Sequence, residues 1–295
     1  MGSALDEIGS AVRSVHLAVA ESVVGVGREG SGVVVGQDLV ATNAHNLRGE
    51  GLTVTFADGR QVAAEATGVD VDGDVAVLRV DTAGAPVLGW AEAGLGDVVF
   101  GVANPGGRGV RVTLGTVSAV GQPFRGPRGR RVAASLEHTA PLPRGASGGP
   151  VVDAAGRIVG LNTHRPQEGF YLALPASAEL IARLDALGRG ESRSRPRLGI
   201  ALAPPRATRQ LREAAGLTDV TGLLVRGVEE GGPAAAGGLR RGDVLVTAGG
   251  RNLTSVDDLH EALDSASGSL DLGIVRGVEE LQVSVVLAGG AGKTP

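Results

Sequence analysis

Ser147 lies in a glycine-rich segment, PRGASGGPVV (143–152), where its hydroxyl could act as a nucleophile. A serine hydroxyl is a weak nucleophile at its own pKa and needs a neighbouring general base. Serine and glycine also dominate ordinary turns, so this segment alone fits either role. A nucleophilic role therefore requires a base, an acid that orients the base, and a rigid fold elsewhere in the chain.

His45 is the best-placed base among the five histidines of the chain. It lies in LVATNAHNL (39–47), directly after an apolar run that predicts a strand, so a sheet could hold its imidazole rigidly. His138 and His164 lie in polar, proline-containing segments typical of exposed loops. His16 lies in a predicted N-terminal helix and His260 in the second part of the chain.

The segment VDVDGDVAVLRV offers three aspartates as the orienting acid. Asp74 borders the apolar run and is expected to point inward, whereas Asp70 and Asp72 are typical turn formers. A buried aspartate that accepts a hydrogen bond from the histidine holds the ring and stabilises its charged form. His45, Asp74 and Ser147 then follow the chain order of chymotrypsin-type proteases, which differs from that of subtilisins and α/β-hydrolases.

The glycines around Ser147 have a role in the same hypothesis. The backbone N–H groups of Gly145 and Ser147 would both have to point at the oxyanion that develops during attack. That arrangement needs an unusual backbone, which glycine adopts at little cost. Gly148 and Gly149 would let the next strand pack closely.

Short valine-rich runs separated by Gly, Asp and Pro fill the chain from about residue 20 to 175. With turn signals between them and almost no helical period, they predict an antiparallel barrel or sandwich. Together with the triad order, this favours a mainly β fold of the chymotrypsin-like double β-barrel type. Helices are predicted over 5–16 and over 177–187, the second with Ser177 as its N-cap.

A polar linker over 188–195 separates this first domain, residues 1–187, from a second module. The module, residues 196–290, mixes predicted strands and helices and is followed by a tail over 291–295. One of its helices is predicted near 256–266, with Ser255 as the N-cap. We expect a small α+β domain.

Composition excludes several classes of protein. The length of 295 residues suggests about two domains, and the net charge of −4 argues against nucleic-acid binding. The absence of cysteine removes disulfides, cysteine metal sites and cysteine nucleophiles. No apolar run is long enough to predict a membrane span, and the N-terminus does not have the pattern of a signal peptide. We expect no metal and no cofactor.

The sequence resembles the HtrA/Deg serine proteases from about residue 20 to residue 290. The matching segments are GSGVVV with VATNAHN, DGDVAVLRV, GVANPGG with VTLGTVSAV, GASGGPVVDAAGRIVGLNT, and GFYLALP. The second module is similar to that family's PDZ domain in RLGI and in GGPAAAGGLRRGDVLVTAGGRNLTSVDDLHEAL. The chain departs from the family at Arg144, where Pro is usual, at Ala146, where Asn is usual, and at Tyr171, where Gly is usual.

The resemblance implies substrate-binding residues in both domains. Two uncharged segments are expected to line the pocket that binds the side chain before the scissile bond, the P1 side chain. Their residues are Pro141, Leu142, Phe170, Tyr171 and Leu172. Because Tyr171 makes this pocket shallow, we expect cleavage after Val, Ala or Ile. In the PDZ domain, a peptide C-terminus is expected to contact the RLGI loop, at Arg197, Leu198, Gly199 and Ile200. Its apolar side chain is expected to contact the predicted helix near 256–266, at Leu259 and Leu263.

The resemblance further implies ATP-independent cleavage of unfolded or damaged proteins by a homotrimer or a larger oligomer. It implies a periplasmic or other extracytoplasmic location, with any export or anchor segment outside this chain. Two alternatives remain open. The protein could be a chaperone or peptide-binding protein that does not cleave, or a regulatory protease for one specific partner.

Overall fold

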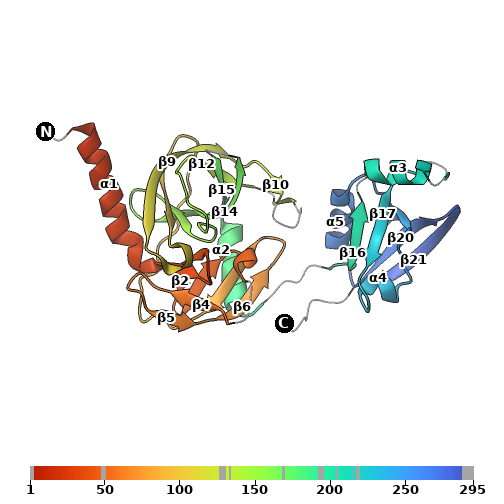
Figure 1. Ribbon diagram of the computed structural model, residues 1–295, viewed down its shortest axis with the longest axis horizontal. Coiled ribbons are helices and arrows are strands. Elements are labelled where there is room, and N and C mark those ends of the chain that lie inside the picture. The colour runs from red at the N-terminus through yellow and green to blue at the C-terminus, as the bar shows by residue number, and fades with distance from the viewer. Residues whose placement is uncertain are drawn as a thin grey trace. The chain divides into compact units, whose positions relative to one another are not determined.

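The computed structural model describes residues 3–47, 51–125, 131–132, 134–167, 170–191, 196–203, 205–214, 216 and 220–287. The chain divides into two compact units, Met1–Arg193 and Ser194–Pro295 (Figure 1). The division falls within the predicted linker, residues 188–195. Residues 192–195 and the predicted tail, 291–295, lie outside the described residues.

The first unit begins with helix α1 (Ala4–Val19) and a seven-stranded antiparallel sheet, ordered β5-β4-β1-β2-β3-β7-β6. Its valine-rich strands bury most of their side chains, as the pattern predicts. The strands are β1 (Val23–Val26), β2 (Gly30–Gly36), β3 (Leu39–Thr42), β4 (Thr53–Thr55), β5 (Gln61–Ala63), β6 (Glu65–Asp70) and β7 (Val75–Arg79).

A second antiparallel sheet closes into a barrel, in the order β12-β15-β14-β13-β8-β9 with β9 also paired to β12. Its strands are β8 (Val98–Ala103), β9 (Arg111–Val120), β12 (Leu136–His138), β13 (Pro150–Val152), β14 (Ile158–Gln167) and β15 (Phe170–Pro175). Strands β10 (Phe124–Arg125) and β11 (Arg131–Val132) pair antiparallel in a separate two-stranded sheet. Helix α2 (Ala178–Gly188) ends the unit.

One apolar core joins the two sheets and both helices. It contains Val33 and Val77 from the first sheet, Phe100 and Ile158 from the barrel, and Leu184 from α2, all buried. Burial of these side chains is the main favourable contribution to folding. The predicted chymotrypsin-like architecture is therefore confirmed, and its two β layers are held against each other by this core.

The helices differ from their predicted bounds in detail. Helix α1 is longer than the predicted 5–16, and its first apolar residues, Leu5 and Ile8, are 79% and 46% exposed. Ser177 caps α2 as predicted, because its hydroxyl accepts from the Leu180 N–H at 3.2 Å. A side chain of the N-cap satisfies a backbone donor that the first helical turn leaves free.

In its described residues, the second unit is a six-stranded antiparallel sheet with three helices. The strands run in the order β16-β17-β18-β20-β21, with β19 paired to β18. The elements are β16 (Ile200–Ala203), α3 (Pro205–Ala214), β17 (Leu223–Val228), α4 (Pro233–Ala236), β18 (Val244–Ala248), β19 (Arg251–Asn252), α5 (Val256–Ser265), β20 (Ser269–Arg276) and β21 (Glu279–Val286). This α+β arrangement, with Ser255 capping α5, matches the prediction.

The buried carboxylate of Asp243, just before β18, bonds to Arg276 at the end of β20. Asp243 is 1% exposed and accepts hydrogen bonds from Arg276 Nε at 2.8 Å, from its terminal nitrogen at 2.9 Å and from the Arg240 N–H at 2.8 Å. Burial raises the pKa of Asp243, but these hydrogen bonds outweigh it and hold the pKa below its usual value.

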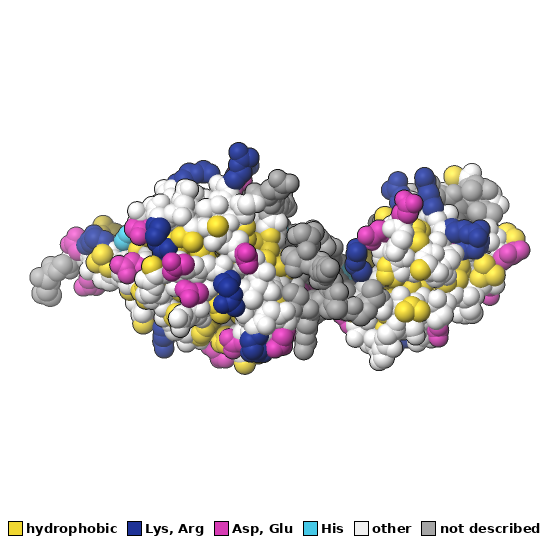
Figure 2. Space-filling model, turned by 90° about the horizontal axis from the view of Figure 1, so that it is seen from below, with side chains coloured by type: hydrophobic (Ala, Val, Ile, Leu, Met, Phe, Trp, Pro, Cys, Tyr) yellow, Lys and Arg dark blue, Asp and Glu magenta, His cyan; other side chains and the backbone are white. Residues whose placement is uncertain are grey.

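On the face seen in Figure 2, acidic and basic side chains are interspersed.

Candidate active site

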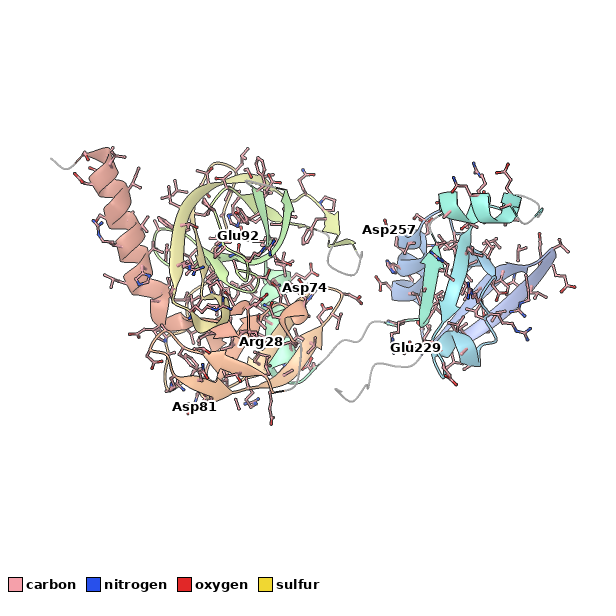
Figure 3. All side chains as sticks on the ribbon, in the orientation of Figure 1. Arg28, Asp74, Asp81, Glu92, Glu229 and Asp257 are labelled. Atoms are coloured by element: carbon pink, nitrogen blue, oxygen red, sulfur yellow. The ribbon has the colours of Figure 1, made fainter. Side chains whose placement is uncertain are left out.

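His45 and Asp74 form a closely bonded pair near the centre of the first unit, where Figure 3 labels Asp74. His45 Nδ1 lies 2.8 Å from one carboxylate oxygen of Asp74 and 2.9 Å from the other. The backbone N–H of His45 also donates to the carboxylate, at 3.1 Å. The Asp74 side chain is 3% exposed and that of His45 is 24% exposed. The buried acid thus orients a ring that solvent and substrate can reach.

Local backbone structure places both residues. His45 lies in a 3-10 turn, Ala44–Asn46, directly after β3. Asp74 lies in the turn between β6 and β7 with a φ of 53°, a left-handed conformation that Asp adopts more readily than most residues. The Asn43 side-chain amide donates to the Asp74 carbonyl at 2.7 Å. Asp70 forms the turn, as predicted, by accepting from the Gly73 N–H at 2.8 Å.

Thr163 is a further partner of the acid that sequence reasoning missed. Its hydroxyl donates to the second carboxylate oxygen of Asp74 at 2.8 Å, although the two residues are 89 positions apart. Thr163 lies on β14 in the barrel, whereas Asp74 directly precedes β7 of the first sheet. The motif GRIVGLNT gave its strand but not its partner, because only the packing of the two sheets brings the residues together.

Ser147 lies in the loop before β13, and its hydroxyl donates to the Thr163 carbonyl at 3.0 Å. Among the described residues, no hydrogen bond joins this hydroxyl to His45. As a nucleophile, the Ser147 hydroxyl would have to turn from the Thr163 carbonyl toward His45 Nε2. Catalytic hydrogen bonds often tighten only when substrate binds.

Gly145 and Ser147 carry two N–H groups without an acceptor in the described part of the chain. Gly145 has a φ of 84°, and a Cβ there would collide with the Glu29 carbonyl. Only glycine satisfies both conditions. The two predicted oxyanion donors, separated by Ala146, are thus free of other acceptors in the described part of the chain.

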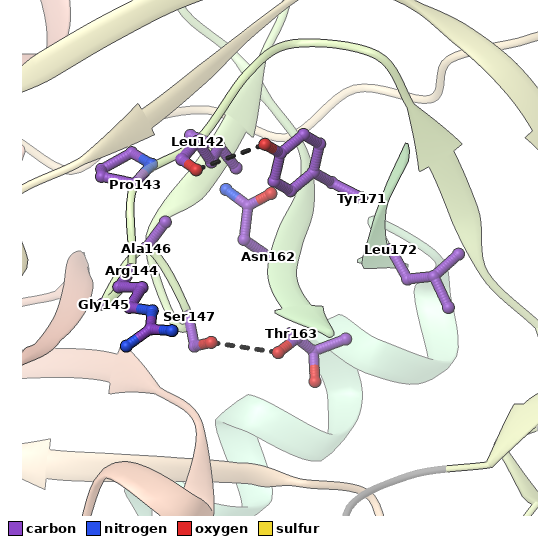
Figure 4. A pocket seen from close by; sticks show the side chains of 10 residues that line it. All are labelled: Leu142, Pro143, Arg144, Gly145, Ala146, Ser147, Asn162, Thr163, Tyr171 and Leu172. Atoms are coloured by element: carbon purple, nitrogen blue, oxygen red, sulfur yellow. Dashed lines mark hydrogen bonds between the residues drawn. The ribbon is translucent and has the colours of Figure 1, made fainter. Parts of the chain in front are cut away.

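A pocket of about 140 Å³ opens beside Ser147 (Figure 4). Of the predicted P1-pocket residues, Leu142, Tyr171 and Leu172 line it. Pro141 and Phe170 do not: Pro141 is exposed between two buried neighbours, and Phe170 lies at the start of β15 opposite Gln167. The remaining lining comes from Pro143, Arg144, Gly145, Ala146, Ser147, Asn162 and Thr163.

Arg144 changes the expected character of this pocket. The two predicted segments contain no charge, but the exposed Arg144 adds a cation to the lining. Tyr171 closes the opposite side, and its hydroxyl donates to the Leu142 carbonyl at 3.3 Å. The pocket thus combines an apolar wall with one positive charge.

The expectation that His138 and His164 lie in exposed loops is wrong. His138 is on β12 and fully buried, and His164 is on β14. The His138 ring stacks on Tyr171 with centroids 5.7 Å apart, and its Nε2 lies 2.9 Å from Asn162 Oδ1. Burial lowers the pKa of His138, partly opposed by the Asn162 hydrogen bond. This histidine supports the pocket wall and is far from a solvated loop.

In the second unit, the predicted peptide-binding residues lie in two groups. Leu198 is buried, Gly199 has a φ of 74°, and Ile200 begins β16. Arg197 forms a two-pronged ion pair with Glu229, at 2.9 and 3.3 Å. On α5, Leu259 and Leu263 are 2% and 4% exposed and belong to the apolar core of the unit.

Within the described residues, no group of histidine and carboxylate side chains has the arrangement of a metal site. Nor does any helix in the described part of the chain have the length and apolar character needed to cross a membrane.

Comparisons with known proteins identify both units. A trypsin-like peptidase domain matches residues 30–161, and a PDZ domain matches residues 224–276. The "Putative serine protease HhoB" of Synechocystis is 32% identical over 80% of this chain and 60% of its own length. The "Probable periplasmic serine endoprotease DegP-like" of Halomonas elongata is 30% identical over 88% of this chain and 56% of its own length. The chain thus spans about 60% or less of these relatives.

Solved structures agree with this identification. The "HtrA-type protease AlgW with decapeptide" superposes with a TM-score of 0.66 at 23% identity, covering 96% of this chain and 99% of that one, which shows the shared fold. A serine endoprotease from Yersinia pestis gives a TM-score of 0.63 at 25% identity, covering 94% of this chain and 97% of that one. With a trypsin-like peptidase domain followed by a PDZ domain, the chain is similar in sequence to serine proteases named DegP-like and in fold to an HtrA-type protease.

Proposed function

We propose that this protein is a serine endopeptidase that degrades unfolded or damaged proteins without ATP and binds peptide C-termini through its PDZ domain. The observation that carries the proposal is the buried Asp74 carboxylate bonded to both His45 and Thr163 beside Ser147. A structural turn would not need a histidine held by a buried acid at this place. The relatives named as serine proteases support the same activity.

The chemistry is acyl transfer to Ser147. His45 Nε2 accepts the hydroxyl proton as Ser147 Oγ attacks the scissile carbonyl carbon, and Asp74 stabilises the resulting imidazolium. The N–H groups of Gly145 and Ser147 bind the oxyanion. His45 then donates its proton to the leaving amine, and water, activated by the same histidine, hydrolyses the acyl-enzyme.

The pocket supports a preference for aliphatic P1 side chains such as Val, Ala and Ile. Its volume of about 140 Å³ is small, which favours compact side chains. The wall formed by Leu142, Tyr171 and Leu172 is apolar, so burial of an aliphatic group is favourable.

The PDZ domain has the features of a peptide-binding sheet edge. Strand β16 is the terminal strand of its sheet, and an extended peptide can add to such an edge. In the described part of the chain, the N–H groups of Leu198 and Gly199 have no acceptor, so they are available to a carboxylate. Leu259 and Leu263 support the groove from within the core, and Arg197 acts mainly as the partner of Glu229.

The assembly and location follow the family. We infer a homotrimer or larger homo-oligomer, consistent with the exposed apolar residues Leu5, Ile8 and Leu17 on α1. We infer a periplasmic or other extracytoplasmic location, because several relatives are named periplasmic endoproteases. Light scattering during gel filtration tests the first inference: a single species with the mass of one chain contradicts it.

Digestion of casein without ATP tests the proposed activity, with Ser147→Ala as the comparison. We expect cleavage by the parent, none by Ser147→Ala, and product C-termini enriched in Val, Ala and Ile. Products ending mostly in Lys, Arg or Phe contradict the pocket assignment. Deletion of residues 196–295 tests the PDZ domain: unchanged substrate binding and turnover contradict its recruiting role.

A second candidate function is a chaperone or peptide-binding protein that does not cleave. The observation that favours it is the bond from the Ser147 hydroxyl to the Thr163 carbonyl, which directs the hydroxyl away from His45. In that case neither the parent nor Ser147→Ala digests casein, while both suppress aggregation of an unfolded protein. Cleavage that starts only after a C-terminal peptide is added indicates instead a protease activated through its PDZ domain.

A further inference from the structure

Ser31, on β2 of the first sheet, bonds directly to the candidate nucleophile loop of the barrel. It is fully buried. Its hydroxyl donates to the Gly145 carbonyl at 2.7 Å, and its backbone N–H donates to the Ser147 carbonyl at 3.1 Å. Gly145 and Ser147 are the two residues whose N–H groups form the proposed oxyanion hole. One residue of the first sheet thus holds both.

The hydroxyl of Ser31 has a defined orientation. It accepts a hydrogen bond from the backbone N–H of Asn104 at 3.0 Å. A serine hydroxyl has one proton to donate, and here that proton goes to the Gly145 carbonyl. Two backbone segments of the barrel, at Asn104 and at Gly145, are therefore joined through one side-chain oxygen.

The Ser31 carbonyl is held as well, so Ser31 itself is rigid. It accepts from the Thr42 hydroxyl at 2.6 Å. The Asn46 side chain, next to His45, donates to the Ser147 carbonyl at 2.9 Å. The turn that carries the base and the strand that carries Ser31 are thus both bonded to the Ser147 backbone.

Gly145 needs such an external restraint. Its φ of 84° is accessible to glycine, but glycine has more backbone freedom than any other residue. The peptide unit is planar, so fixing the Gly145 carbonyl fixes the plane of the 145–146 peptide. Only the backbone torsions at Gly145 and Ala146 then separate this plane from the peptides that carry the two proposed donors. The energy of an oxyanion hole depends on donors that are already in place when charge develops.

We infer that Ser31 is a positioning residue of the oxyanion hole: its hydroxyl and N–H set the backbone of Gly145 and Ser147 from the opposite sheet. This inference rests on the proposed endopeptidase function. It assigns Ser31 no contact with the substrate, so its loss should affect the transition state and leave ground-state binding nearly unchanged.

Ser31→Ala tests the inference, measured on a peptide amide substrate. A misplacement of catalytic groups by about 1 Å costs on the order of 100-fold in rate, so we expect kcat to fall about 10- to 100-fold with little change in KM. The affinity for a peptide boronate, which forms a tetrahedral adduct with a serine nucleophile, should weaken in parallel. If Ser31 had a purely structural role, Ser31→Ala would lower the melting temperature without a selective fall in kcat.

Ser22→Ala is the matched control. Ser22 is also fully buried in the first unit, and its hydroxyl donates to the Pro86 carbonyl at 2.8 Å. We expect a similar loss of stability and unchanged kcat. If Ser31→Ala does not fold, Ser31→Cys keeps a weaker donor at nearly the same volume and should show a smaller fall in kcat.

The outcomes separate the inference from the proposed function. Ser147-dependent turnover by the parent, with equal kcat and boronate affinity in Ser31→Ala and Ser22→Ala, overturns the role of Ser31 alone. Absence of Ser147-dependent turnover in the parent overturns the proposed function and the role of Ser31 with it.

Discussion

Replacement of Tyr171 by alanine should change which peptide bonds are cleaved. Tyr171 is 9% exposed and forms one wall of the pocket beside Ser147. Removal of its ring takes away this wall, so the pocket of about 140 Å³ should become markedly larger. Larger P1 side chains would then fit, and small ones would leave a void.

The size of the change follows from the apolar surface involved. One methylene more or less in a hydrophobic pocket changes kcat/KM by about 10- to 200-fold. We expect the ratio of kcat/KM for a Phe substrate to that for a Val substrate to rise at least about 10-fold in Tyr171→Ala. The assay is a series of peptides that differ only in the P1 residue.

Tyr171→Phe is the control for this prediction. It keeps the ring and its stacking on His138 and loses only the hydroxyl that donates to Leu142. Its P1 ranking should equal that of the parent. Truncation of a buried aromatic residue costs about 3–5 kcal/mol of stability, so folding of Tyr171→Ala must be verified by circular dichroism. A folded Tyr171→Ala with the parent's P1 ranking refutes the reasoning.

Three further predictions concern single groups. Arg276→Met should lower the urea midpoint of the second unit, because it removes two hydrogen bonds to the buried Asp243 carboxylate. The pKa of Asp243 is lowered, so this contribution to stability should be present above about pH 4 and lost as the pH falls further. The pKa of His138 is lowered in the folded protein, so the unfolded chain takes up a proton first as the pH falls. Below about pH 6.5, the free energy of unfolding of the parent should therefore fall relative to that of His138→Gln, by up to about 1.4 kcal/mol per pH unit. A difference between the two proteins that does not change with pH would contradict this. Arg144→Gln should lower kcat/KM for peptides with Glu beside the scissile bond at low salt, whereas Arg79→Gln, also at an exposed arginine, should not.

The sequence predicts the fold and the pairing of base and acid because both depend on local patterns. His45 and Asp74 each adjoin an apolar run, and the antiparallel pairing of β3 with β7 brings the ends of those runs together. Ser177 and Ser255 could be recognised as N-caps because capping involves residues only three positions away.

The contacts that the sequence did not predict all depend on packing between distant segments. His138 is surrounded in sequence by polar residues and prolines, and β12 is only three residues long, too short for alternation to reveal its buried side. The Thr163 contact with Asp74 and the Ser31 contact with Gly145 span 89 and 114 positions. A periodic pattern shows which face of a strand is buried but not which strand it faces.

These long-range contacts all run between the two sheets, which bears on how the site works. Thr163 of the barrel bonds to Asp74 of the first sheet, and Ser31 of the first sheet bonds to Gly145 and Ser147 of the barrel. The buried acid and the proposed oxyanion donors are therefore each bonded to the opposite sheet. A small shift of one sheet against the other would disturb both at once while leaving each sheet's own hydrogen bonds intact. Activity should consequently be lost at a lower denaturant concentration than the secondary structure of the first unit, and coincident transitions would show that the two sheets separate only when they unfold.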